Sequence, residues 1–142
     1  LNWRFCDPRA GSFNILKATL NHELLGYLIS RINTYIEDYP IGYIVDLMTT
    51  PGEVGVPDFL LEEALSELDE HGINIVLSMI PKGHVYQGHY ARNGFVDSRK
   101  NLNMYTNLNY HGEEGLLEGI SPDMVHFNYG SIDSLPVSYP RQ

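Results

Sequence analysis

The sequence contains a single cysteine, Cys6, among its 142 residues. An internal disulfide needs a second cysteine and a cysteine-rich zinc site needs several, so both are excluded. One free thiol fits a reducing compartment, and we expect a cytoplasmic protein. The six histidines are scattered along the chain, so no metal site is predicted.

Positive charge is also scarce. Nine Lys and Arg residues face 18 Asp and Glu residues, which leaves a net charge of −9. Proteins that bind nucleic acid need cations clustered on one face, so no nucleic-acid partner is expected. The negative charge also opposes long-range attraction of an anionic ligand, although backbone amides can still hold a small one.

Long apolar runs are absent. No segment approaches the roughly 20 residues that cross a bilayer, so no membrane partner is expected. The Gly-x-Ser-x-Gly motif is missing and no histidine is near Cys6 in the sequence, so nucleophilic hydrolysis has no support. The first residue is Leu rather than Met, and we expect the chain to be cut from a longer polypeptide.

The overall composition is typical of one globular domain, with 43% hydrophobic and 19% charged residues. Three β-rich segments come first, at residues 13–20, 24–33 and 43–49. Short turns at "NHE" and "YPIG" separate them. Strands joined by short turns pair antiparallel, so we predict a three-stranded meander.

After these segments, the hydrophobic residues recur with the spacing of an α-helix. Leu61, Leu65 and Leu68 follow i, i+4, i+7 spacing. Pro57 and Asp58 are expected to open this helix, with Asp58 as its N-cap. The apolar run at residues 73–80 predicts a central strand that is covered on both faces.

Further elements are predicted after this strand. We expect a short helix at residues 84–93 and two strands at residues 95–98 and 102–108. Residues 1–110 then form the domain, and residues 111–142 form an extension with a possible last strand at 124–130 and a tail. The whole is an α+β fold: a mixed, mostly antiparallel sheet with a central βαβ step and flanking helices.

Three stretches resemble the acyl-CoA N-acyltransferase (GNAT) superfamily from its second strand onward, without its N-terminal strand and helices. "GYIVDLMTTP" is similar to the family's fourth strand, whose end splays from the next strand and receives the pantetheine arm. "GEVGVPDFLL" resembles the loop and helix start that hold the coenzyme pyrophosphate. "HYARNGF" resembles the family's Tyr-x-x-x-Gly-Phe. The resemblance covers residues 13–108.

The resemblance implies transfer of an acetyl group from acetyl-CoA to an amine of unknown identity, on a small molecule or a protein. Six residues would bind the coenzyme: the backbone of Leu47, Met48 and Thr49 for the pantetheine arm, and Gly52, Val54 and Gly55 for the diphosphate. Tyr90 would protonate the leaving thiolate, and Asp46 is the candidate base.

Each candidate has a structural alternative. A phenol with a pKa near 10 stays protonated at neutral pH, which suits Tyr90 as an acid, but its ring can equally pack under the sheet. Asp46 either faces a polar cleft or needs a buried partner. His84 replaces the family's asparagine and could relay a proton. With His89 it is expected to form a pair of surface imidazoles.

The loop departs from the family pattern, which falls on Gly52, Gly55 and Pro57 and retains only Gly55. Pro57 has no N–H group, Asp58 as an N-cap would occupy further donors, and Glu53 would repel phosphate. These departures support a second hypothesis. It is a catalytically inactive GNAT-fold domain that serves as a scaffold or as the pairing half of a larger protein. For either function, the expected protein partner is a second copy in a homodimer or an upstream domain.

Overall fold

The computed structural model describes residues 5–7, 12–33 and 39–99 of the chain. In chain order its elements are β1 (Asn14–Leu20), β2 (Glu23–Asn33), β3 (Ile41–Thr49), α2 (Val56–Glu70), β4 (Ile75–Ser78) and α3 (Gln87–Arg92). The predicted meander, the long helix and the short helix are therefore all confirmed. No helix in this described part is long and apolar enough to cross a membrane.

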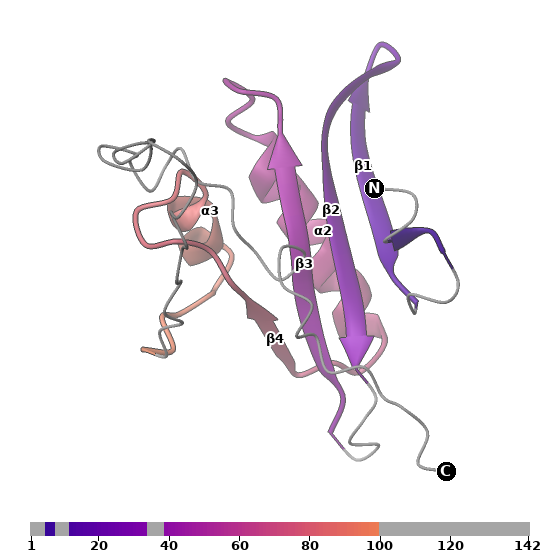
Figure 1. The fold of residues 1–142 in the computed structure, drawn as a ribbon, viewed down its shortest axis with the longest axis vertical. Coiled ribbons are helices and arrows are strands. Elements are labelled where there is room, and N and C mark those ends of the chain that lie inside the picture. The colour runs from indigo at the N-terminus through magenta and orange to yellow at the C-terminus, as the bar shows by residue number, and fades with distance from the viewer. Residues whose placement is uncertain (1–4, 8–11, 34–38, 100–142) are drawn as a thin grey trace, which may run out of the picture.

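The four strands form one sheet in the order β1-β2-β3-β4. β1, β2 and β3 pair antiparallel, whereas β4 pairs parallel to β3 after the crossover through α2. Figure 1 shows α2 lying across one face of the sheet and α3 beside the end of β3. This arrangement confirms the predicted α+β fold with its βαβ step.

β3 carries one extra residue in its pairing with β2. Ile29 lies opposite Asp46, while the next residue, Ser30, lies opposite Ile44. Val45 is therefore left without a partner across the strand pair, which makes a β-bulge. A bulge bends its strand and changes the direction of nearby side chains, and bulges are frequent next to functional sites.

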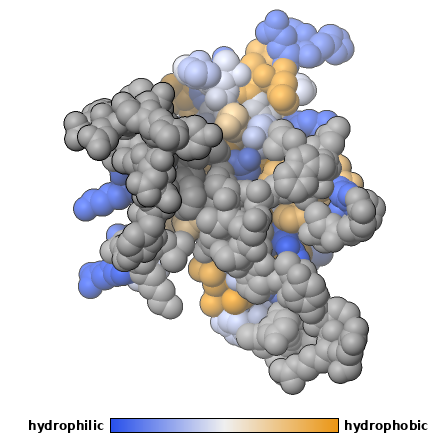
Figure 2. All heavy atoms as spheres, viewed as in Figure 1, coloured by the Kyte–Doolittle hydropathy of each residue, from blue (hydrophilic) through white to orange (hydrophobic). Residues whose placement is uncertain are grey.

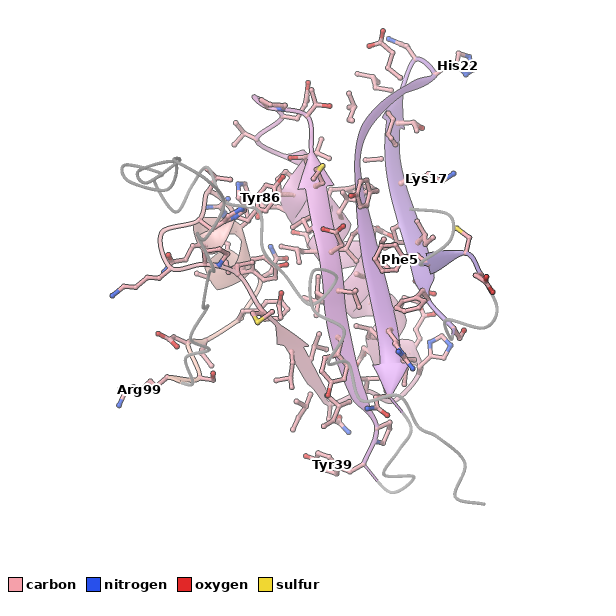
Figure 3. All side chains as sticks on the ribbon, viewed as in Figure 1. Phe5, Lys17, His22, Tyr39, Tyr86 and Arg99 are labelled. Carbon is pink, nitrogen blue, oxygen red and sulfur yellow. The ribbon has the colours of Figure 1, made fainter. Side chains whose placement is uncertain are left out.

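Two clusters of buried side chains stabilise the sheet, one on each face. The first lies between the sheet and the two helices, and its buried members are Ala18, Leu28, Ile44, Leu47, Leu60, Leu61, Ala64, Leu68, Ile73, Tyr86 and Tyr90. The second lies on the opposite face, where Phe5 packs over the strands (Figure 3) with Ile29, Tyr43 and Val45. Each fully buried aliphatic side chain contributes about 1.5–3 kcal/mol relative to an exposed one.

The tip of the β1–β2 hairpin carries apolar side chains outside both clusters. Leu20 and Leu24 are 61% and 53% exposed, and Figure 2 shows apolar surface beside the hydrophilic tip of this hairpin. The turn itself places Asn21 and His22 at φ values of 50° and 71°. Left-handed conformations at both central residues match the twist of a tight hairpin.

Helix α2 begins earlier than the sequence pattern predicted. Its N-cap is Gly55, with no side-chain capping bond, and Pro57 lies in its first turn. Pro57 is tolerated there because the first amides of a helix have no partner within the helix. The prediction that Asp58 is the N-cap is therefore wrong: Asp58 is already helical, and its carboxylate contacts α3 instead.

Strand β4 differs from the predicted central strand. It lies at the edge of the described sheet, and Ile75 and Leu77 are 36% and 37% exposed. Residues 95–98 form no strand, because a strand needs a pairing partner and the described residues offer them none. The predicted strands at 102–108 and 124–130 lie outside the described residues, and so does the predicted domain boundary at residue 110.

Candidate functional site

The two parallel strands separate toward α3. Residues 41–44 of β3 pair with residues 75–78 of β4, but β3 continues to Thr49. Figure 1 shows β3 and β4 diverging beyond their paired segment, with α3 next to the open end. Residues 45–49 therefore have one backbone edge that β4 does not pair. The splayed strand end predicted from the sequence is present.

The backbone of β3 directs its amide hydrogens alternately to the two sides of the strand. The N–H of Thr50 points toward β2, where it donates to the carbonyl oxygen of Leu25 over 2.7 Å. The N–H of Thr49 consequently points into the opening. There it donates to the hydroxyl oxygen of Tyr86 over 2.8 Å, and the Thr49 Oγ1 lies 3.1 Å from the same oxygen.

Tyr86 was not among the residues predicted from the sequence. Its side chain lies between α3 and β3 (Figure 3) and is only 9% exposed. The ring packs against His84 with centroids 5.0 Å apart and against His89 with centroids 6.2 Å apart. A sequence signal existed, because Tyr86 precedes Tyr90 by four residues, the spacing that places two side chains on one helix face.

His84 is buried rather than exposed, so the predicted pair of surface imidazoles is wrong. Its Nδ1 accepts a hydrogen bond from the backbone N–H of Tyr86 over 3.2 Å. This contact supports the first turn of α3, because the backbone of Tyr86 has no helical acceptor there. His84 Nδ1 cannot take up a proton without losing that bond.

Tyr90 lies one helical turn after Tyr86. Its side chain is 6% exposed, and its ring packs edge-to-face on Phe95 with centroids 4.9 Å apart. Burial raises the pKa of Tyr90 above its usual value, a hydrogen bond with Ser78 opposes this, and the charge of Asp46 raises it further. The buried ring therefore fits the alternative in which Tyr90 packs under the sheet. The raised pKa also keeps the phenol protonated, as a general acid requires.

Asp46 lies at the bulge of β3 and is 8% exposed. The Tyr27 hydroxyl donates a hydrogen bond to its Oδ2 over 3.1 Å. Burial, followed by the charge of Asp46, raises the pKa of Tyr27 to about 12. The buried Asp46 side chain therefore has a hydrogen-bond partner, the half-buried Tyr27. Because its charge also raises the pKa of Tyr90, the two predicted catalytic residues lie within electrostatic reach of each other.

The loop between β3 and α2 keeps some amide hydrogens unused. Glu53, Val54 and Val56 donate theirs to carbonyl groups within the loop. The amides of Gly52, Gly55 and Asp58 donate no hydrogen bond within the described residues. Unpaired amides at a helix start attract anions.

The surroundings of the two loop glycines are open. Gly52 has a φ of +92°, and a Cβ atom built on either Gly52 or Gly55 would meet no atom within 4 Å. Val54, whose amide is already used, has a 73% exposed side chain. The predicted diphosphate residues therefore lie around an accessible backbone surface.

The carboxylate of Asp58 is held by α3 and not by the amides of its own helix. It accepts hydrogen bonds from Arg92 Nη2 over 2.9 Å and from Asn93 Nδ2 over 3.1 Å, and His89 Nδ1 lies 3.0 Å away. The hydrogen bond from Arg92 is the main cause that lowers the pKa of Asp58. Arg92 pairs with the charge of Asp58, whereas the Glu53 side chain is exposed in the loop.

The described residues contain no group of three or more His, Cys, Asp or Glu side chains that could hold a metal ion. A pocket of about 330 Å³ lies between the far end of β2 and the end of α2, and its lining includes Ser30, Arg31, Glu67 and His71. None of the predicted site residues lines this pocket within the described part of the chain.

Comparisons with known proteins identify the fold. No known protein family and no curated protein matches the sequence. An aminoglycoside acetyltransferase from an uncultured soil metagenomic sample, solved with trehalose, superposes with a TM-score of 0.59 at 20% identity, over 69% of this chain and 67% of that chain.

Two further solved structures are similar in the same way. An aminoglycoside 6′-N-acetyltransferase from Acinetobacter haemolyticus, in its apo form, has a TM-score of 0.54 at 17% identity, over 68% of this chain and 71% of its own. A predicted acetyltransferase from Clostridium acetobutylicum, solved with acetyl-CoA, has a TM-score of 0.54 at 18% identity, over 66% of this chain and 64% of its own. Likeness at this level shows the fold that these proteins share.

Proposed function

Because the chain has the fold of the GNAT acetyltransferases, we propose that it transfers an acetyl group from acetyl-CoA to an amine. The amine nitrogen attacks the thioester carbonyl, so that a C–N bond forms, the C–S bond breaks, and the ammonium proton leaves. The observation that carries this proposal is the opening between β3 and β4. The β3 edge that β4 does not pair leads to the loop amides before α2 that donate no hydrogen bond within the described residues.

Coenzyme binding follows from the backbone geometry. A pantetheine arm contains two amide groups, which can pair with the open edge at Leu47, Met48 and Thr49 as an added strand would. The diphosphate then lies over Gly52, Val54 and Gly55, where the amides of Gly52 and Gly55 donate no hydrogen bond within the described residues. These two amides and the positive end of the α2 dipole stabilise negative charge. A similar protein from Clostridium acetobutylicum was solved with acetyl-CoA, which supports this coenzyme.

The catalytic residues in this proposal are Asp46 and Tyr90, the two that were predicted from the sequence. Asp46 accepts the proton of the attacking amine, directly or through a water molecule. Tyr90 donates a proton to the leaving thiolate, since its raised pKa keeps the phenol protonated. Bound reactants held in line for attack supply much of the rate enhancement, and amides on the open edge of β3 stabilise the developing oxyanion.

A small cationic amine is the acceptor that the charge of the chain favours. A net charge of −9 raises the local concentration of cations and steers them toward the protein. Two of the similar structures are aminoglycoside acetyltransferases, which supports a small-molecule amine over a protein amine.

A second candidate function is a non-catalytic scaffold with the same fold. Two observations favour it: the Tyr86 hydroxyl already occupies the Thr49 amide, and Pro57 removes one donor from the start of α2. In this case the domain would pair with a second copy or an upstream domain and would bind no coenzyme.

Isothermal titration of acetyl-CoA into the purified protein distinguishes the two functions. A dissociation constant in the low-micromolar range or tighter is expected for the enzyme, whereas no heat at millimolar acetyl-CoA would favour the scaffold. Gly52→Ala and Gly72→Ala form a matched pair, since both glycines have a positive φ and open space around them. Both variants are strained, but only Gly52→Ala is expected to weaken acetyl-CoA binding.

A further inference from the structure

At Thr49, the backbone N–H on the open edge of β3 donates a hydrogen bond to another residue of the same chain. Buried N–H groups without a partner are costly, and β4 has already separated from β3 at this position. The phenol oxygen of Tyr86 supplies the missing acceptor at 2.8 Å. A carbonyl oxygen of a bound pantetheine arm would have to use the same amide.

The side chain of Tyr86 is held in place from several directions. Its ring contacts His84 and His89, and it belongs to the core cluster between the sheet and the helices. Its backbone N–H is bound by His84, and the helix that follows is attached to α2 through Asp58 and Arg92. The backbone of Tyr86 is thus fixed, so the side chain has to rotate if the opening is to admit a ligand.

We infer that Tyr86 is an internal latch on the coenzyme site: its hydroxyl occupies the Thr49 amide in the free protein and leaves when the pantetheine arm binds. This inference rests on the proposed acetyl-CoA binding. Acetyl-CoA then competes with an intramolecular hydrogen bond, and its measured affinity is lower than the site would show with the latch open. Removing the hydroxyl alone is expected to tighten binding.

The test uses Tyr86→Phe, which retains the ring and its packing, with Tyr39→Phe as the matched control. Tyr39 is 51% exposed and lies at the other end of the sheet (Figure 3). Acetyl-CoA is titrated calorimetrically into the wild type and both variants. Loss of one hydrogen bond predicts binding up to about tenfold tighter in Tyr86→Phe, and unchanged binding in Tyr39→Phe.

A second measurement examines the latch without coenzyme. Amide hydrogen exchange at Thr49, followed by NMR, is expected to be about tenfold faster in Tyr86→Phe than in the wild type, because the amide loses its acceptor. Addition of acetyl-CoA should then slow the exchange in both proteins to a similar rate. Equal exchange in the two free proteins would overturn the latch.

The titration outcomes separate this inference from the proposed function. If the wild type and Tyr86→Phe bind acetyl-CoA equally well, or the variant binds less tightly, the latch is wrong and coenzyme binding stands. If neither protein binds, the latch and the proposed function are both wrong. If binding is detected only in Tyr86→Phe, the latch is supported, and the Tyr86 hydroxyl is what prevents detectable binding in the wild type.

Discussion

The Tyr27 hydroxyl donates a hydrogen bond to Asp46 Oδ2 across the β2–β3 strand pair, over 3.1 Å. The β-bulge explains how they meet. Consecutive residues in a regular strand point to opposite faces, but Val45 packs in the second core cluster while Asp46 lies opposite Ile29 of that same cluster. The extra residue therefore directs the Asp46 carboxylate toward the face that carries Tyr27.

Replacing Tyr27 with Phe is expected to change stability in alkaline solution. The pKa of Tyr27 is raised to about 12 in the folded protein, from 10.0. Between these values the unfolded chain loses the proton and the folded chain keeps it, so the free energy of unfolding falls as pH rises. Tyr27→Phe should show a shallower fall between about pH 10 and pH 12, measured as the urea unfolding midpoint. Tyr39→Phe, which alters an exposed phenol, should follow the wild type.

At neutral pH the same variant loses the hydrogen bond to Asp46. We expect a loss of about 1 kcal/mol in the free energy of unfolding. Parallel pH curves for the wild type and Tyr27→Phe would contradict the proposed coupling between Tyr27 and Asp46, whatever the difference at neutral pH.

Asp58→Asn is expected to loosen α3 from α2. The change removes the charge that Arg92 and His89 contact, and exposed pairs of this kind contribute about 1 kcal/mol or less. The pKa of Asp58 is lowered in the folded protein from 3.8, so its contribution is present above that pH and is lost as pH falls through the folded value. The stability difference between wild type and variant should shrink in acid.

Urea unfolding at pH 7 and pH 3, with and without 1 M NaCl, checks this prediction. Salt should reduce the difference at pH 7, because exposed charges are screened. Glu63→Gln on the exposed side of α2 is the matched control and should change stability by less than about 0.5 kcal/mol at either pH. A difference that is independent of both salt and pH would mean that the ion pair contributes nothing.

Local periodicity was enough to predict β1, β2, β3, α2 and α3, because each of these elements is encoded by its own spacing and turn residues. The start of α2 was missed since Gly55 and Asp58 are both favourable N-cap residues and Pro57 fits either start. The sequence could not predict whether β4 is a central strand or an edge strand, because an apolar run is compatible with either position in a sheet.

The candidate site was predicted only in part. The resemblance of "HYARNGF" and "GYIVDLMTTP" to a known family pointed to Tyr90 and Asp46 as catalytic residues, and their catalytic roles stay a prediction. It missed Tyr86, whose bond with Thr49 joins residues 37 positions apart. No local pattern encodes such a contact, since it depends on how far β4 separates from β3.

Two glycine substitutions should have opposite effects on stability. A Cβ atom on Gly26 would lie 2.8 Å from the Met48 carbonyl oxygen and 2.8 Å from Thr49 Cγ2, so Gly26→Ala forces β2 and β3 apart. We expect a loss of about 1–3 kcal/mol. On Gly88 the nearest atom is the Arg92 Nη1 at 3.5 Å, so Gly88→Ala should stabilise α3 by about 0.5–1 kcal/mol.

Urea unfolding measures both effects, and titration with acetyl-CoA adds a second comparison. Because Gly26→Ala displaces Met48 and Thr49, it should also weaken binding, whereas Gly88→Ala should leave affinity unchanged. Wild-type stability in Gly26→Ala would show that β3 moves freely against β2, and the open edge would then be a less rigid binding surface than proposed.

Tyr90→Phe tests the proposed chemistry most directly. The phenol is buried and keeps its proton well above neutral pH, so wild-type turnover should not fall between pH 7 and pH 9 through loss of this acid. Removing the hydroxyl leaves the thiolate to depart unprotonated, and turnover should fall by about 100-fold or more, while the dissociation constant of acetyl-CoA changes little. Acetyl transfer is measured as release of free thiol, with a panel of small amines as acceptors. Because the ring still packs on Phe95, the variant should fold. Unchanged turnover would leave Tyr90 with a packing role alone.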